Sequence, residues 1–211
     1  MEKEGNKKQQ TRARIKTIGA KRFIEKGLRE TMIIDIAEEV GIDRRTIYRY
    51  YASKELLLIE ICADYLRNFV NKVESVSCEH LTSGYEKVVH LFNEYFRLLK
   101  EEPDVILFLG MIDTSVGQHI YDVKMYRELD KHGKKLDAHL AKIIEEGQED
   151  GSINSRFEPT EYAITINNSI VALATRVAIY LPNTLIQGKG FSWKLLLNQG
   201  KILIESLKTK K

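Results

Sequence analysis

The chain is poor in cysteine, proline and tryptophan, and the shortage of cysteine limits the metal and redox sites that it can hold. Its 211 residues include two cysteines, three prolines and one tryptophan. Cys62 and Cys78 stand at no spacing typical of a metal or redox site, so both are expected to be reduced and to pack as small apolar residues. The sequence therefore predicts no metal site and no cofactor.

Long apolar runs are missing as well. No stretch approaches the roughly 18 to 20 apolar residues that cross a bilayer, and residues 1–8 lack the apolar core of a signal peptide. We therefore expect a cytoplasmic protein with no membrane partner. No phosphate-binding glycine loop, nucleophile elbow or acid–base pair is recognisable, so no catalytic residue is predicted and an enzyme is not expected.

What is present is helical sequence of ordinary globular composition. Hydrophobic residues make up 43% and charged residues 30%, and the length suits one small domain and one larger domain with its own core. Pro103, Pro159 and Pro182 each fall between apolar periodic stretches, as helix punctuation does. No strand-like alternation of useful length occurs. The sequence predicts an all-α fold of about nine helices.

Residues 31–55 predict two short helices joined by a glycine turn. Apolar residues recur at helical spacing before Gly41, which can adopt the left-handed backbone that ends a helix. Asp43 can cap the next helix through its carboxylate. With a preceding helix over about residues 9–26, these elements predict a three-helix unit in domain 1–55, a helix-turn-helix of the kind that enters a DNA major groove. Its expected core is Phe23, Ile36, Val40, Ile47 and Tyr51.

These residues resemble the tetracycline-repressor (TetR) family of bacterial transcription regulators. The resemblance covers roughly the first quarter of the chain. Arg45 stands where many members have glycine, and Met32 where many have serine or threonine; Met32 cannot cap, so Thr31 is expected to cap the second helix. The matching residues are Asp35-Ile36-Ala37, Gly41-Ile42, Asp43, Thr46-Ile47-Tyr48, Tyr50-Tyr51 and Ser53-Lys54-Glu55, with Ile15, Ile18, Phe23 and Lys26-Gly27 upstream.

The resemblance implies a sequence-specific transcriptional regulator, more often a repressor than an activator, that binds a palindromic operator in double-stranded DNA as a homodimer. Charge agrees, since residues 1–55 hold 14 Lys and Arg against nine Asp and Glu, whereas the remainder holds 19 against 21. The residues expected to contact DNA are Thr31, Arg44, Arg45, Thr46, Tyr48, Arg49, Tyr50 and Lys54.

Residues 56–211 are expected to form a helical domain for effector binding and dimerisation. In the resembled family this domain usually binds a small molecule that releases DNA by shifting the helix that begins at Lys54; the same helix could equally be a rigid strut. The candidate pocket residues are aromatic or Met-rich with one polar group, and each could instead be core. They are Phe92, Tyr95, Phe96, Phe108, Met111, Tyr126 and Asn167.

The last two predicted helices, residues 160–181 and 191–208, each carry two apolar stripes. One stripe suffices to dock a terminal helix on its own chain, so a second indicates a partner, although a wholly intramolecular core is the alternative. The expected dimer interface is Ile166, Ile170, Leu173, Val177, Trp193, Leu196, Gly200, Leu203 and Leu207. For the whole chain, the alternative function is a helical dimeric interaction protein, or a non-specific DNA binder without effector control.

Overall fold

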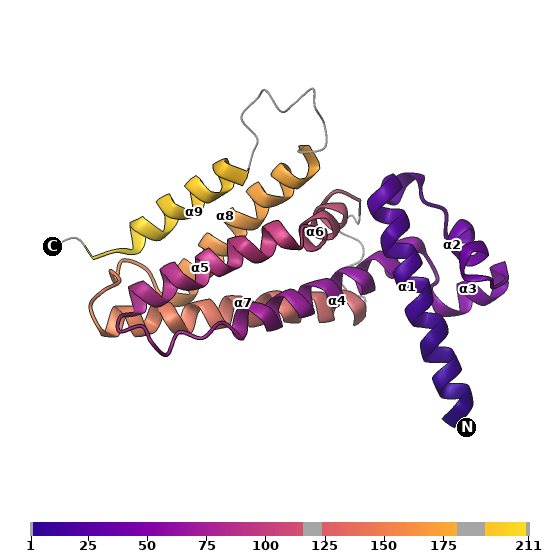
Figure 1. The fold of residues 1–211 in the computed structure, drawn as a ribbon, viewed down its shortest axis with the longest axis horizontal. Helices are drawn as coiled ribbons and strands as arrows, with labels where there is room; N and C mark the ends of the chain where they lie inside the picture. The colour runs from indigo at the N-terminus through magenta and orange to yellow at the C-terminus, as the bar shows by residue number, and fades with distance from the viewer. Residues whose placement is uncertain (1, 116–123, 181–192, 210–211) are drawn as a thin grey trace. The chain divides into compact units, whose positions relative to one another are not determined.

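The computed structural model describes residues 2–115, 124–180 and 193–209. Within these ranges the backbone is helical, apart from loops and an isolated bridge between Ile153 and Lys208. The prediction of an all-α chain is confirmed (Figure 1). The nine helices that these residues form are α1 (Glu2–Glu30), α2 (Ile33–Val40), α3 (Arg44–Tyr50), α4 (Lys54–Glu74), α5 (Gly84–Glu101), α6 (Asp104–Ser115), α7 (Lys124–Glu149), α8 (Pro159–Tyr180) and α9 (Trp193–Leu207).

Two of the three prolines stand where helices begin, as expected. Pro103 directly precedes α6, and Pro159 is the first residue of α8, where its missing N–H costs no hydrogen bond. Pro182 lies outside the described residues. Among the described helices, none is both long and apolar enough to span a membrane.

The chain divides into two compact units. Unit 1 comprises Met1–Tyr65 and the described residues of Met111–Leu129, and unit 2 comprises Leu66–Gly110 and Asp130–Lys211. The first division falls inside α4, ten residues later than the boundary predicted at residue 55. The reason is that the first turns of α4 pack on α1 and so group with unit 1.

Ion pairs hold α1 against these first turns of α4. The guanidinium of Arg12 donates to both carboxylate oxygens of Glu60, at 2.9 and 2.5 Å. The ammonium of Lys16 lies 3.4 Å from Glu60 and also pairs with Asp64. Both cations and both carboxylates are spaced four residues apart, one turn of an α-helix, so the pairs form a ladder between the two helices.

Helix α1 is longer than the sequence predicts. It begins at Glu2 rather than near residue 9, and after Gly27, whose φ of 73° and ψ of 167° are not helical, the chain makes one more turn to Glu30. The predicted core of unit 1 is confirmed, because all five of its side chains are buried. They are Phe23, Ile36, Val40, Ile47 and Tyr51.

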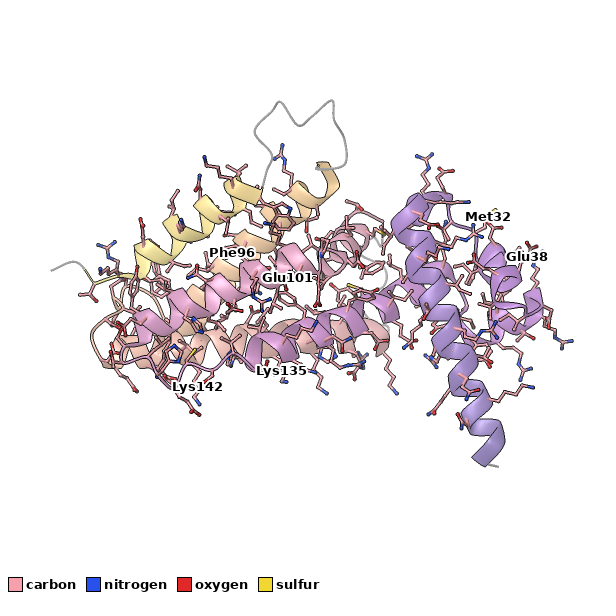
Figure 2. The ribbon with its side chains drawn as sticks, viewed as in Figure 1. Met32, Glu38, Phe96, Glu101, Lys135 and Lys142 are labelled. Atoms are coloured by element: carbon pink, nitrogen blue, oxygen red, sulfur yellow. The ribbon has the colours of Figure 1, made fainter. Side chains whose placement is uncertain are left out.

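Two glycines allow helices of unit 2 to approach closely. A Cβ atom added to Gly84, the first residue of α5, would lie 2.2 Å from the backbone of Gly147 in α7. A Cβ atom on Gly200 in α9 would lie 2.1 Å from the ring of Phe96 in α5. Phe96 is labelled in Figure 2. Helix α9 runs back along α8 and also packs on α5, so the C-terminal helix is docked within its own chain (Figure 1).

Candidate nucleic-acid interface

The start of helix α3 is fixed by Asp43. Its carboxylate accepts a hydrogen bond from the backbone N–H of Thr46 at 2.9 Å and another from the Thr46 hydroxyl at 2.7 Å. These two bonds from Thr46 hold the pKa of the Asp43 carboxyl below its usual value. The predicted cap is therefore present, and it uses the one proton of the Thr46 hydroxyl.

The outward face of α3 carries three guanidinium groups and a phenol. Arg44, Arg45 and Arg49 are exposed, and the Tyr48 side chain is 41% exposed. The guanidinium carbon of Arg44 lies 6.0 Å from the centre of the Tyr48 ring, at the outer limit of a cation–π contact. Guanidinium groups can donate two hydrogen bonds to guanine or to a phosphate, so this face suits the edge of a DNA major groove. Tyr50 is half-buried.

The C-terminal end of helix α2, which leads into α3, is fixed by a glycine turn and by two arginines of α1. Gly41 has a left-handed backbone (φ 76°, ψ 38°), and its N–H donates to the carbonyls of Ala37 and Glu38. The guanidinium of Arg14 in α1 donates to the carbonyl oxygen of Val40 at 2.8 Å. Arg22, also in α1, donates to the Glu39 carboxylate at 2.8 Å. Two arginines of α1 therefore hold the C-terminal end of α2.

The predicted cap at Thr31 is wrong. Helix α2 has Met32 at its N-cap position, with no capping hydrogen bond from a side chain, and Met32 is 58% exposed (Figure 2). The Thr31 side chain is 1% exposed, and its hydroxyl donates to the Gly27 carbonyl at 2.7 Å, with the Arg22 carbonyl at 3.2 Å. Thr31 ties down the end of α1, because the turn at Gly27 leaves carbonyls there without helical partners.

Lys54, like Thr31, binds backbone carbonyls at the C-terminal end of α1. Its ammonium donates to the carbonyl oxygens of Leu28, Arg29 and Thr31 at 2.7, 3.0 and 3.0 Å. An ammonium has three protons, and these three bonds use all of them. The positive charge also suits the C-terminal end of α1, where helix carbonyls collect partial negative charge. Lys54 therefore ties the start of α4 to the end of α1, and its predicted phosphate contact stays a prediction.

The aromatic residues expected to line an effector pocket are packed in this structure. The rings of Phe92, Tyr95 and Phe96 lie with centroids 6.0 to 6.3 Å apart in α5, and Phe108 is fully buried. This matches the alternative, that these residues are core. Met111 and Tyr126, both in unit 1, are half-buried.

A chain of polar groups crosses this packed region of unit 2. The Tyr95 hydroxyl donates to the Asn167 side-chain oxygen at 3.0 Å, and the Asn167 amide donates to the Asp137 carboxylate at 2.8 Å. Tyr95 and Asn167 are buried, and burial raises the pKa of Asp137 above its usual value. The expected pocket residue Asn167 is thus a hydrogen-bonded link between α5 and α7.

The dimer interface predicted on the last two helices stays a prediction, and many of its residues also pack inside the chain. Within the chain the structure buries six of the nine residues, namely Ile166, Ile170, Val177, Leu196, Gly200 and Leu207. Leu173, Trp193 and Leu203 are half-buried. The exposed apolar side chains are instead Ile164 of α8 and Leu195, Leu197 and Ile202 of α9. Two apolar stripes were correctly read from the sequence, but periodicity does not tell which one faces inward.

Comparisons with known proteins agree with this interface. Residues 19–61, which contain α2 and α3, match the family described as "Bacterial regulatory proteins, tetR family". The chain is similar to the HTH-type transcriptional repressor KstR2 of Mycolicibacterium smegmatis, with 24% identity over 135 residues, 64% of this chain and 63% of KstR2. The match thus spans less than two thirds of that relative's length.

Solved structures resemble the chain over nearly its whole length. A tetR-family regulatory protein from Rhodococcus RHA1 has a TM-score of 0.68 and 15% identity, covering 95% of this chain and 98% of that one. Thermus thermophilus FadR, a tetR-family repressor solved in complex with lauroyl-CoA, has a TM-score of 0.63 and 21% identity, covering 95% and 96%. At these identities the likeness establishes a common fold.

Proposed function

The chain belongs to the tetR family of bacterial regulatory proteins, and from this premise we propose that it is a sequence-specific DNA-binding transcriptional repressor. The observation that carries the proposal is the outward face of α3, where Arg44, Arg45, Tyr48 and Arg49 are exposed on a helix capped by Asp43. A short cationic helix held on a buried core can enter a major groove and read base edges. Such a repressor acts in the cytoplasm, where chromosomal DNA lies.

We further propose that it binds a palindromic operator as a homodimer. The exposed apolar residues of the last two helices, Ile164, Leu195, Leu197 and Ile202, support an interface between two copies of unit 2. A two-fold dimer places two copies of α3 about one turn of DNA apart or somewhat more, so that each reads one half-site.

A small-molecule effector completes the proposal. The structure of the relative FadR holds lauroyl-CoA, which supports an effector site for this chain as well. Helix α4 begins four residues after α3 ends and continues without a break into unit 2. A change in unit 2 that shifts α4 can therefore reach the DNA-reading helix and weaken operator binding.

Selection from a random pool of duplex DNA tests the function directly. The purified protein is incubated with random duplexes at stated salt, and bound duplexes are amplified and sequenced over several rounds. We expect enrichment of one palindrome whose half-sites lie about one helical turn apart. If the folded, dimeric protein enriches no sequence, the proposal is wrong, and a helical interaction protein becomes the better description.

A further inference from the structure

The first turns of α1 extend beyond the core of the helix-turn-helix and run beside α3. Between Glu2 and Ile15, the first fully buried residue of α1, the helix adds about 20 Å of length. Figure 1 shows these turns extending past α2 and α3. They precede residue 19, where the match to the tetR family begins, so the family match assigns no role to them.

A groove of about 600 Å³ separates these first turns from α3. Helix α1 contributes two exposed ammonium groups, on Lys7 and Lys8, and α3 contributes the exposed guanidinium of Arg49. The complete lining is Gly5, Lys7, Lys8, Thr11, Ile42, Thr46, Arg49 and Tyr50. We call this surface the α1–α3 groove. None of these lining residues is acidic, so the three charged side chains of the groove, Lys7, Lys8 and Arg49, all carry positive charge.

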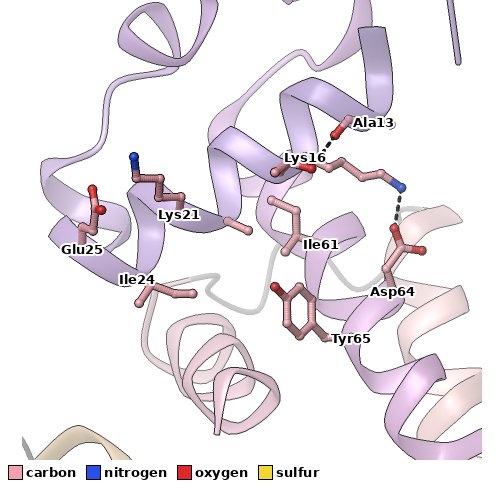
Figure 3. A pocket seen from close by; sticks show the side chains of 10 residues that line it. Ala13, Lys16, Lys21, Ile24, Glu25, Ile61, Asp64 and Tyr65 are labelled. Carbon is pink, nitrogen blue, oxygen red and sulfur yellow. Dashed lines mark hydrogen bonds and ion pairs between the residues drawn. The ribbon is translucent and has the colours of Figure 1, made fainter. Parts of the chain in front are cut away.

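Two other hollows on the described surface carry charges of both signs. One, of about 530 Å³, lies between α1 and α4; basic Lys21 and acidic Glu25 both line it, and Lys16 bonds to Asp64 (Figure 3). The other, of about 610 Å³ in unit 2, is lined by basic and acidic residues that form ion pairs with one another. Those pairs are Lys72–Glu102, Arg97–Glu94 and Arg97–Glu101. The single sign of the α1–α3 groove is therefore a specific feature.

We propose that the α1–α3 groove binds the sugar–phosphate backbone of the duplex whose bases α3 reads, with Lys7 and Lys8 as phosphate contacts. This inference rests on the proposed function and adds a contact surface to it. Duplex DNA carries one negative charge per about 1.7 Å of its axis, so a backbone strand beside the major groove meets a surface of matching charge. Arg49 lies on α3 itself, so the groove is continuous with the base-reading face.

The positions of Lys54 and Thr31 strengthen the argument. Both were expected to hold phosphates, yet the ammonium of Lys54 and the hydroxyl of Thr31 are bound to carbonyls at the end of α1. A duplex seated on α3 still needs cations along its backbone, because phosphate contacts supply most of the sequence-independent affinity. The exposed lysines at the start of α1 are placed to supply them.

The salt dependence of DNA binding tests the proposal. The protein with Lys7→Gln and Lys8→Gln is titrated onto two fluorescent duplexes, the one enriched from the random pool and a shuffled duplex of the same composition, over about 0.05 to 0.4 M salt. Each phosphate contact contributes about 0.9 to the slope of log affinity against log salt, and a bound dimer carries these two lysines on each copy. Loss of the four contacts should therefore make the slope shallower by about 3.6. The affinity at about 0.1 M salt should fall roughly tenfold or more, and by a similar factor for both duplexes, because backbone contacts carry no base information.

Two control proteins separate charge at the groove from other effects. Lys26→Gln with Lys100→Gln removes the same charge from exposed positions on α1 and α5, and should leave the slope unchanged. Lys7→Arg with Lys8→Arg keeps the charge and should keep the slope. A loss of slope in the arginine protein would overturn the proposal, because the cause would then be a change in the structure of α1.

The remaining outcomes are equally clear. If the wild-type protein binds the enriched duplex and the glutamine variant retains the full slope, the groove does not hold phosphates while the proposed function stands. If the variant loses affinity for the enriched duplex alone, the lysines contact bases and the backbone assignment is wrong. If the wild-type protein binds neither duplex, the proposed function itself fails, and the groove proposal fails with it.

Discussion

Neighbouring side chains of helix α3 meet opposite environments. Ile47 is completely buried, whereas Tyr48, the next residue, is 41% exposed. Arg44 lies one turn before Tyr48 on the same outward face. A substitution on this face can therefore change DNA recognition without disturbing the core that holds the helix.

Arg44→Ala and Tyr48→Ala should each weaken binding to the enriched operator duplex. We expect a loss of roughly 1 to 3 kcal/mol in binding free energy, because each removes a contact to a base edge or the adjacent backbone. Circular dichroism and analytical ultracentrifugation should show unchanged helicity and oligomeric state. Arg156→Ala, which removes an exposed guanidinium from unit 2, serves as the control. Full operator affinity in both α3 variants would mean that another element reads the bases.

His139 should make the stability of the protein depend on pH. Its side chain is half-buried, its Nε2 has no hydrogen-bond partner among the described residues, and burial lowers its pKa from the usual 6.5. The unfolded chain therefore takes up the proton at higher pH than the folded protein does. The stability from the neutral ring is complete above about pH 6.5 and falls as pH drops through 6.5 toward the folded pKa.

We expect the thermal midpoint of the wild-type protein to decrease between about pH 7.5 and pH 5.5. His139→Gln should lessen that decrease, since the amide does not titrate. Identical pH profiles for His139→Gln and the wild type would show that other groups cause the effect.

At the scale of the helices, close packing between α9 and α5 depends on one missing side chain. Gly200→Ala would place a methyl group 2.1 Å from the Phe96 ring, so the helices must separate or the ring must move. We expect the free energy of unfolding to fall by about 1 to 3 kcal/mol, the usual range for overpacking. Chemical denaturation followed by circular dichroism measures this change.

Gly133→Ala in α7 is the matched control. A Cβ atom at Gly133 would meet nothing within 4 Å, and the residue lies inside a helix, where alanine is favoured over glycine by about 0.5 to 1 kcal/mol. The two substitutions should therefore change the free energy of unfolding in opposite directions. Equal effects at both positions would contradict the close approach of α9 to α5.

Helices could be predicted from this sequence because apolar spacing, prolines and caps are local signals. Asp43 illustrates this, since its cap on α3 involves a residue only three positions away. The positions of Thr31 and Lys54 could not be predicted. Both bind carbonyls made available by the turn at Gly27, and Lys54 reaches Leu28 across 26 positions. Their roles depend on tertiary packing.

The same distinction explains the site assignments. Exposure of Arg44, Arg45 and Arg49 follows from the helical period around Ile47. The inward stripe of α9 does not follow from period, because its two faces are nearly equally apolar and only packing on α5, through Gly200, selects one. The groove at Lys7 and Lys8 was missed for a similar reason. The excess of positive charge in the first 55 residues was the available signal, but a net charge does not indicate which lysines line a groove.

At the scale of the whole molecule, assembly should depend on the exposed stripe of α9. Ile202 is 67% exposed, the largest exposed fraction among the large hydrophobic side chains of the described residues. If it lies in a dimer interface, Ile202→Glu buries two carboxylates about the two-fold axis, which strongly opposes association. We expect this variant to sediment as a monomer at concentrations where the wild type is dimeric, and to lose affinity for the palindrome.

Lys201→Glu introduces the same side chain at the neighbouring exposed position and should leave the dimer intact. A dimeric Ile202→Glu protein would place the interface elsewhere. A monomer that still binds one half-site weakly would agree with the proposed arrangement, since each copy carries a complete DNA-reading unit.

The ladder between α1 and α4 has a mechanical consequence. Its rungs join Arg12 and Lys16 to Glu60 and Asp64, so two points on one rod are pinned to two points on the other. A helix held by one ion pair can rotate about it, whereas ion pairs one helical turn apart oppose that rotation. We therefore expect α1 and the first turns of α4 to move together as one rigid part of unit 1.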